Sequence, residues 1–148
     1  MNDIPALNKS AERKLSIIND TPGIFTIVDS DSAVGRKPLY EIDSFSEVGK
    51  WCGLIIHQSK KHGVDPRLVA AIMYMETTHG WYDKVYPYYN IEFGITLLSR
   101  IQARIENPTI RKIATIYNFL GAEVVSDYGA RVAKLYLEQP RSPAKCAV

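Results

Sequence analysis

The stretch that decides the fold is residues 62–80, which read HGVDPRLVAAIMYMETTHG. It predicts a loop, a helix of about three apolar turns, and one carboxylate just before the helix ends. Asp65 is a natural N-cap, because its side-chain oxygen can accept from the free backbone N–H groups of the first turn. Pro66 follows at the first helical position, where its fixed φ favours the helix. Gly80 marks the predicted end of this helix.

The carboxylate on this helix shares its apolar face. Four residues fall at the spacing i, i+3, i+4 and i+7: Val69, Ile72, Met73 and Glu76. Burial and the negative end of the helix dipole both disfavour the ionised form of such an acid, and a carboxyl group that stays protonated is what a general acid requires. In the alternative, Glu76 lies at the edge of the stripe, in water or paired to a lysine. Spacing alone leaves both open.

Length and composition indicate one globular domain. The 148 residues are 46% hydrophobic and 23% charged, as in ordinary globular proteins. A net charge of +2 is too small to argue for nucleic acid, but it suits an acidic polymer such as a bacterial cell wall. No apolar run reaches the length of a membrane span, and residues 1–9 contain no apolar core of a signal peptide. Cys52 and Cys146 either form one disulfide or stay as two buried thiols.

The rest of the chain reads as mainly α. Helices are predicted for residues 1–20, 44–61, 90–107, 110–119 and 123–137, with a loop over 77–89 and a loose tail. The inward-facing side chains are Val48, Cys52, Ile55 and Ile56, then Ile113, Ile116, Tyr117 and Leu120, then Val124, Tyr128, Val132 and Leu135. Residues 24–28 form the one strand candidate, which pairs with a segment such as 39–42 or is merely extended. His57 and His62 lie five apart without a third ligand, so neither a metal nor a cofactor is expected.

Several separated blocks have the order and spacing of one family. They are residues 62–77, the NIEFG of 90–94 with Leu97 and Leu98, the IATIYN of 113–118, and the DYGARV of 127–132. With these blocks the chain resembles the lysozyme-like lytic transglycosylases and goose-type lysozymes over about residues 45–137. The resemblance implies a mainly α, lysozyme-like single domain spanning 1–148, with a short extended segment near the N-terminus. Residues 1–44 would add a helix and that segment, and 138–148 a tail.

Two departures separate the chain from that family. Thr77 stands where the family carries a serine after its glutamate. The glycine–leucine–methionine–glutamine block of the family is absent, and the loop over 77–89 is short and aromatic instead. This truncated pattern looks most like the glycoside-hydrolase effectors exported by bacterial type VI secretion, which agrees with the absence of a signal peptide.

The resemblance implies cleavage of the β-1,4 bond between N-acetylmuramic acid and N-acetylglucosamine in peptidoglycan. Protonating the leaving oxygen requires a carboxylic acid that is still protonated near neutral pH, and Glu76 is the candidate. In a hydrolase, Asp83 is the candidate base, although it reads equally well as a solvated loop residue. A lytic transglycosylase needs no second carboxylate, because the C6 hydroxyl of the sugar attacks.

Substrate-binding residues are expected on both sides of the acid. Tyr117 would lie near Glu76, and Asn118 would donate to an N-acetyl carbonyl; a plain core position is the alternative for the tyrosine. The loop supplies Thr77, His79, Trp81 and Tyr82, whose side chains either contact sugar or fold the loop.

The expected partners are a peptidoglycan glycan strand and a cognate immunity protein that blocks the groove, with no nucleic acid and no membrane. The protein would be made in the cytoplasm and delivered to the periplasm of a target cell. The alternative from another class is a non-catalytic module that binds cell-wall glycan or another protein on a lysozyme-like fold, and the missing block motivates it.

Overall fold

The structure is a computed structural model that describes residues 24–36, 48–76 and 87–138, except for the side chains of 87–90. Its helices are α3 (Cys52–His62), α4 (Pro66–Met75), α5 (Pro87–Gln102), α6 (Ile110–Asn118) and α7 (Asp127–Glu138). In these ranges β-pairing is limited to two isolated bridges. The prediction of a mainly α fold is confirmed. The elements predicted for residues 1–20 and 39–42, and the tail after 138, lie outside the described residues.

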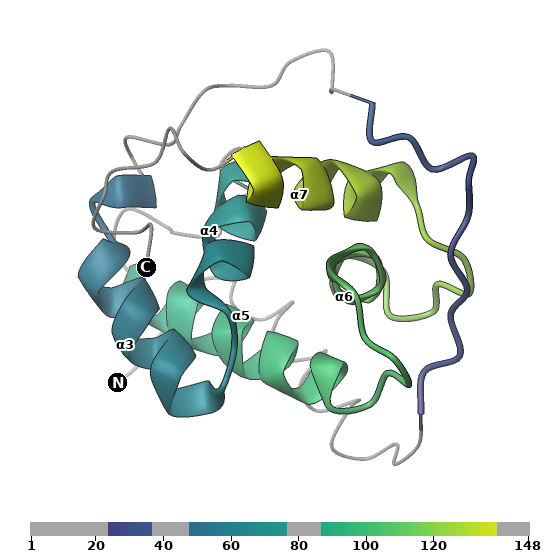
Figure 1. Cartoon of the computed structure of the whole chain (residues 1–148). Helices are drawn as coiled ribbons and strands as arrows, with labels where there is room; N and C mark the ends of the chain where they lie inside the picture. Colours follow the sequence, from purple (N-terminus) through teal and green to yellow (C-terminus); the bar gives the residue numbers. More distant parts are fainter. Residues whose placement is uncertain (1–23, 37–47, 77–86, 139–148) are drawn as a thin grey trace.

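The central element is α4, with α3 and α7 packed against it (Figure 1). Every side chain from Leu68 to Tyr74 is buried, so this helix is apolar on all sides and needs neighbours on all sides. Asp65 caps it as predicted, because its Oδ1 accepts from the Arg67 N–H at 2.8 Å. The helix ends at Met75, earlier than the predicted stop at Gly80, which lies outside the described residues.

The boundaries of α3 and α5 differ from the prediction. The helix predicted from residue 44 is interrupted by a turn at 50–51 and resumes at Cys52; Gly49, a poor helix former, stands at the break. Val48, Cys52 and Ile55 are buried as predicted, whereas Ile56 is only half-buried. The predicted loop over 77–89 is wrong at its end, because α5 already begins at Pro87, a residue suited to the first turn.

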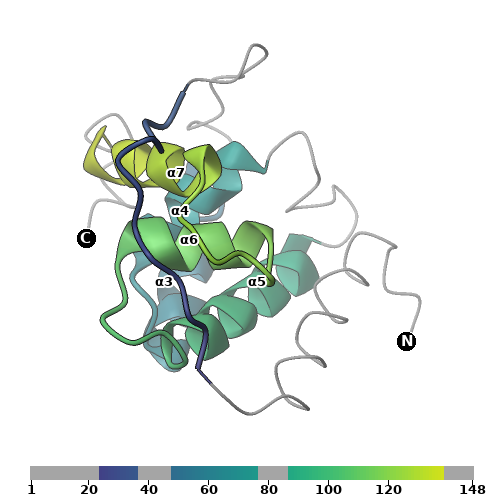
Figure 2. The ribbon, with the colours of Figure 1, turned by 90° about the vertical axis from the view of Figure 1, so that its right-hand side faces the viewer.

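Residues 24–36 form an extended segment, here called the strap, that crosses α6 and α7 (Figure 2). It pairs in parallel at two points, Phe25 with Ile105 and Val28 with Val124. The Phe25 N–H donates to the Arg104 carbonyl at 2.8 Å. This pairing takes Ile105 out of α5, which explains why that helix ends at Gln102 and not near residue 107.

The second bridge explains the late start of α7. The Val28 N–H donates to the Glu123 carbonyl at 3.0 Å, and the Val125 N–H donates to the Val28 carbonyl at 2.9 Å. Residues 123–125 are therefore extended, and the predicted helix start at Glu123 is wrong by four residues. The inward position predicted for Val124 is also wrong, since its side chain is 50% exposed and Val125 is buried in its place.

Most of the other core positions predicted in α6 and α7 are confirmed. Ile113, Ile116, Tyr117, Val132 and Leu135 are buried as predicted. Leu120 lies beyond the end of α6 and is only partly buried.

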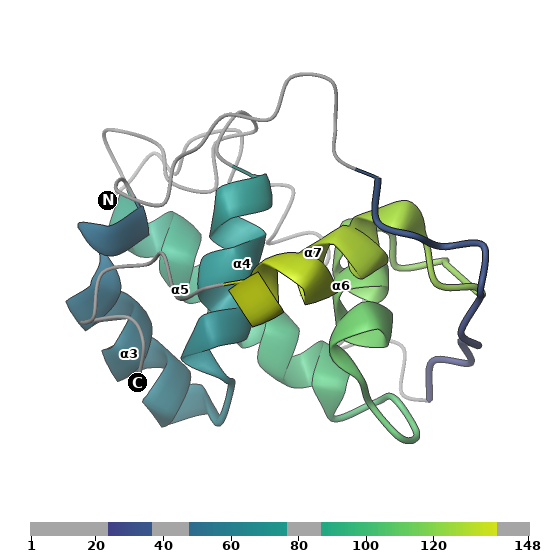
Figure 3. The same ribbon diagram turned by 45° about the horizontal axis from the view of Figure 1, so that its top comes forward.

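Helices α6 and α7 approach each other very closely. Gly129 lies against α6, where a Cβ atom added to it would collide with the Thr115 hydroxyl and the Arg111 carbonyl oxygen. Figure 3 shows α7 lying between α4 and α6, and it packs against both of these helices. The position of α7 itself is therefore fixed by contacts with two helices.

Candidate functional site

Glu76 is the C-cap of α4. Its N–H donates to the carbonyls of Ile72 and Met73 at 2.9 and 3.1 Å, and its φ and ψ of −98° and 11° take the chain out of the helix. The residue is partly buried, at the end of a helix whose residues 68–74 are all buried. Its carboxyl group therefore belongs to the negative end of the α4 dipole, at the edge of the core.

The Tyr128 hydroxyl faces this carboxyl group from the first turn of α7. The hydroxyl is buried and makes no well-aligned hydrogen bond to the described residues. Glu76 is nevertheless close enough to act on it, both through its charge and as an acceptor of imperfect geometry. Burial, then the charge of Glu76, then Tyr117 raise the pKa of Tyr128 well above its usual 10.0.

Tyr117 completes a cluster of three groups with Glu76 and Tyr128. It is the penultimate residue of α6 and is buried, and it contributes to the raised pKa of Tyr128. The three side chains come from the end of α4, the end of α6 and the start of α7. The cluster is called the Glu76 site below.

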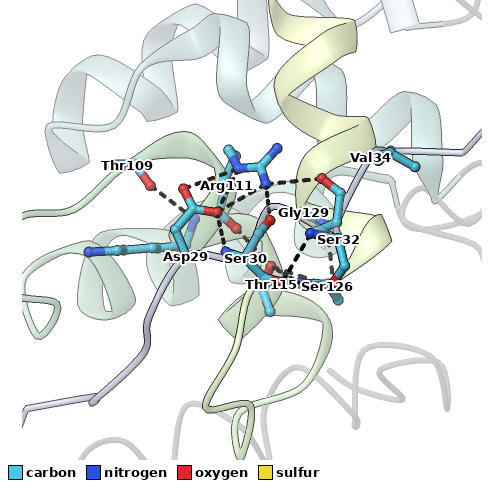
Figure 4. Close-up of polar contacts among 12 residues, drawn as sticks. Asp29, Ser30, Ser32, Val34, Thr109, Arg111, Thr115, Ser126 and Gly129 are labelled. Atoms are coloured by element: carbon cyan, nitrogen blue, oxygen red, sulfur yellow. Dashed lines mark hydrogen bonds and ion pairs between the residues drawn. The ribbon is translucent and has the colours of Figure 1, made fainter.

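Polar contacts between α6 and α7 hold the two tyrosines in register (Figure 4). The Thr115 hydroxyl donates to the Arg111 carbonyl at 2.7 Å, and its oxygen accepts from the Ser126 N–H at 3.1 Å. The Gly129 N–H donates to the Ser126 hydroxyl oxygen at 3.4 Å and so closes the first turn of α7. Tyr128 lies inside that turn.

The far end of α7 is fixed to the start of α4. The Tyr136 hydroxyl donates to Asp65 Oδ2 at 2.5 Å, and the Arg67 guanidinium donates to the Tyr136 carbonyl at 2.8 Å. The same guanidinium carbon lies 4.5 Å from the centre of the Tyr136 ring, within range of a cation–π contact. The hydrogen bond to Asp65 is the main reason why the pKa of Tyr136 is raised. Helix α7 thus contacts α4 near both of its ends.

This geometry pairs a carboxyl group with a phenol that keeps its proton. Because the pKa of Tyr128 is raised, its hydroxyl stays a neutral donor throughout the range in which a carboxyl group gains and loses its proton. A donor in a desolvated position stabilises a carboxylate more than one in water does. The Glu76 site is therefore able to release a proton and then support the charge that remains.

The sequence-predicted site residues divide into two groups. Glu76 and Tyr117 come together, and Asn118 is exposed next to Tyr117 at the last position of α6. The remaining candidates lie outside the described residues: Thr77, His79, Trp81, Tyr82 and Asp83. Tyr128 was predicted only as a core residue of its helix. One sequence feature could have marked Tyr128 as a site residue: it is a tyrosine on an apolar stripe. A hydroxyl that is buried in this way needs a polar partner.

Cys52 is disulfide-bonded, which excludes a free thiol at this position. The only other cysteine of the sequence, Cys146, lies outside the described residues. Among the residues that the structure describes, no three His, Cys, Asp or Glu side chains gather as a metal site, and no helix is long and apolar enough to cross a membrane. His57 is exposed and His62 partly buried.

Comparison of the chain with protein-family models, with curated proteins and with solved structures finds no match.

Proposed function

We propose that the protein is a peptidoglycan glycoside hydrolase, a muramidase that cleaves the β-1,4 bond between N-acetylmuramic acid and N-acetylglucosamine. Glu76 is the general acid. The observation that carries the proposal is the contact of a partly buried carboxyl group, at the end of a buried helix, with the buried Tyr128 hydroxyl. The resemblance of residues 62–77 and 113–118 to the lysozyme-like families supplies the substrate class.

In the first step, Glu76 gives its proton to the bridging glycosidic oxygen while the bond from that oxygen to the anomeric carbon breaks. The leaving sugar departs as an alcohol, and Glu76 is left as a carboxylate. Tyr128 then donates its hydrogen bond to this carboxylate, since its raised pKa keeps the phenol neutral. Tyr117 packs beside both groups and limits the water that reaches them.

Two second steps are compatible with this acid. In hydrolysis, water attacks the anomeric carbon and a base such as Asp83 takes a proton from it. In the alternative, a lytic transglycosylase, the C6 hydroxyl of the muramic acid attacks and its proton returns to Glu76. The Glu76 site on its own supplies the groups for the second route, which is why transglycosylation stays the alternative.

The substrate contacts follow from the position of the acid. Asn118, exposed next to Tyr117, is proposed to donate to an N-acetyl carbonyl. Thr77, His79, Trp81 and Tyr82 follow Glu76 in the sequence and are proposed to bind the glycan beside the scissile bond, with aromatic faces against sugar rings.

The proposed setting is an antibacterial effector delivered to the periplasm of a target cell. The disulfide at Cys52 supports an oxidising site of action, because disulfides persist there and are rare in the cytosol. A cognate immunity protein of the producing cell would then cover the Glu76 site.

The test compares the wild type with Glu76→Gln on purified peptidoglycan sacculi. The glutamine has the same shape but no proton to give, so loss of release by a factor on the order of a thousand is expected. Glu106→Gln, at an exposed position between α5 and α6, is the matched control and keeps full activity. If the wild type and Glu76→Gln bind sacculi equally and release nothing, the protein is a non-catalytic binding module.

A further inference from the structure

One carboxylate ties the strap to the first turn of α7. Asp127 Oδ1 accepts from the N–H groups of Val34 and Gly35 at 2.9 and 3.2 Å, and Oδ2 pairs with Arg36 at 3.2 Å. Gly35 adopts a φ of +71°, and a Cβ atom there would lie 2.8 Å from the Ala130 carbonyl carbon. No larger residue fits this approach, so the strap meets α7 in a single geometry.

A second attachment ties the strap to α6. Arg111 Nε donates to the Asp29 carboxylate at 3.0 Å, and Arg111 Nη2 donates to the carbonyls of Ser30 and Ala33 at 2.9 and 3.0 Å (Figure 4). This hydrogen bond to Arg111 is the main reason why the pKa of Asp29 is below 3.8. The Arg111 carbonyl in turn accepts from Thr115, which contacts the residue just before Asp127. The strap, α6 and the start of α7 thus form one polar network.

Tyr128 stands between Asp127 and Gly129, two residues that this network holds, but it contributes no hydrogen bond of its own to the network. Its hydroxyl has no well-aligned hydrogen bond to the described residues. The backbone on either side of it is fixed instead, by Asp127 through the strap and by Gly129 through its approach to α6. The distance between the hydroxyl and Glu76 is therefore set by the anchors of the turn.

We propose that Asp127 is a positioning residue, which holds the Tyr128 hydroxyl against Glu76 by tying the first turn of α7 to the strap. Its effect on catalysis rests on the proposed function, but its effect on Tyr128 does not. A purely structural role is the competing explanation, because an acid in the first turn of a helix stabilises that helix. That role leaves the surroundings of Tyr128 unchanged in a folded variant.

The test follows the ionisation of Tyr128 by NMR of tyrosine labelled with ¹³C at Cζ, with Tyr128→Phe used only to assign the signal. In the wild type the pKa of this tyrosine is expected to lie well above 10.0, because its hydroxyl is buried and faces Glu76. In Asp127→Ala it is expected to titrate nearer to 10.0, because the turn loosens and the hydroxyl meets water. Asp127→Asn keeps an oxygen that accepts both N–H groups, so it retains the wild-type titration. Arg36→Ala removes only an ion pair of a side chain that is 79% exposed, and is the second control.

Activity on sacculi supplies the second measurement. Asp127→Ala is expected to lower kcat by a factor on the order of 10 to 100 with an unchanged KM, as for a misplaced group beside the reacting atoms. Asp127→Asn is expected to keep most of the wild-type kcat. If the folded wild type releases nothing from sacculi, the proposed function fails, while the Tyr128 titration still tests Asp127.

The proposal is overturned if Asp127→Ala folds and Tyr128 titrates as in the wild type. If Asp127→Ala does not fold, Arg36→Glu replaces it, because a glutamate at this exposed position repels the Asp127 carboxylate without opening the core. A lower pKa of Tyr128 in Arg36→Glu than in the wild type then supports the proposal, and an unchanged pKa contradicts it.

Discussion

Glu76 and Tyr128 depend on each other chemically although they come from different helices. The carboxylate raises the pKa of the phenol, and the phenol supplies a donor that never ionises in the working range of the carboxyl group. In the proposed mechanism the two groups take different roles: Glu76 donates the proton, and Tyr128 stabilises the charge that remains.

The raised pKa values of the tyrosines predict a loss of stability in alkali. As the pH passes 10.0, an unfolded chain loses its tyrosine protons while folded Tyr128 and Tyr136 keep theirs, so the unfolded state is favoured. Their contribution is complete below this pH and is lost as the pH rises through the folded-state pKa values. The decline is at most about 1.4 kcal/mol per pH unit for the buried Tyr128 and is smaller for Tyr136, which lies nearer to solvent.

Urea unfolding at pH values from about 8 to about 11 measures this decline. Tyr128→Phe, which has no proton to lose, is expected to show a shallower decline than the wild type. Equal slopes in the two proteins would contradict a buried, raised-pKa tyrosine at this position.

The sequence predicted that Glu76 lies at the end of its helix, but it did not predict Tyr128 as its neighbour. The position of Glu76 follows from helical spacing, since the apolar residues that define this spacing lie on its own helix. Tyr128 has the same spacing as a core residue, and its partner is on α4, about fifty positions away in the chain. Only the packing of α7 against α4 shows that its hydroxyl faces the Glu76 carboxyl group.

Among the elements, the contact of α6 with α7 is the most sensitive to substitution. Gly129→Ala puts a methyl group into the Thr115 hydroxyl and the Arg111 backbone, which cannot move without shifting α6. The variant is expected to lose about 3 kcal/mol of unfolding free energy, the upper part of the usual range for overpacking.

The matched control is Gly53→Ala in α3, where an added Cβ atom meets nothing within 4 Å. Because alanine is the better helix former, this variant is expected to gain up to about 1 kcal/mol. Thermal unfolding of both variants measures the difference. Similar melting temperatures for the two would show that α6 and α7 are less closely packed than described here.

The helix boundaries show where local sequence reasoning stops. The caps at Asp65 and Thr109 are local hydrogen bonds, so α4 and α6 begin where the sequence predicts. The end of α5 and the start of α7 depend on Ile105 and Val124, which pair with the strap about eighty and ninety-six positions away. Such pairing competes with helix formation, and the local sequence of neither segment reveals it.

For the whole molecule, the disulfide at Cys52 is a constraint added to an otherwise helical core. Cys52 is buried on α3, which packs against both α4 and α5. Reduction of the wild type is therefore expected to lower the unfolding free energy by about 2–4 kcal/mol. Chemical unfolding with and without a thiol reductant measures this loss.

Cys52→Ala serves as the control, since a reductant should not destabilise it further. If the reductant leaves the unfolding free energy of the wild type unchanged, the disulfide does not stabilise the fold. It then no longer supports an oxidising site of action.

Glu76 is proposed to drive cleavage of the glycan strand, and mass spectrometry of the muropeptides released from purified sacculi tests this claim. The wild type is expected to release fragments cut at the anomeric carbon of N-acetylmuramic acid. Reducing ends would identify hydrolysis, and anhydro ends transglycosylation. Glu76→Gln is expected to release none. Equal release by Glu76→Gln, or cuts confined to the peptide stems, would contradict the claim.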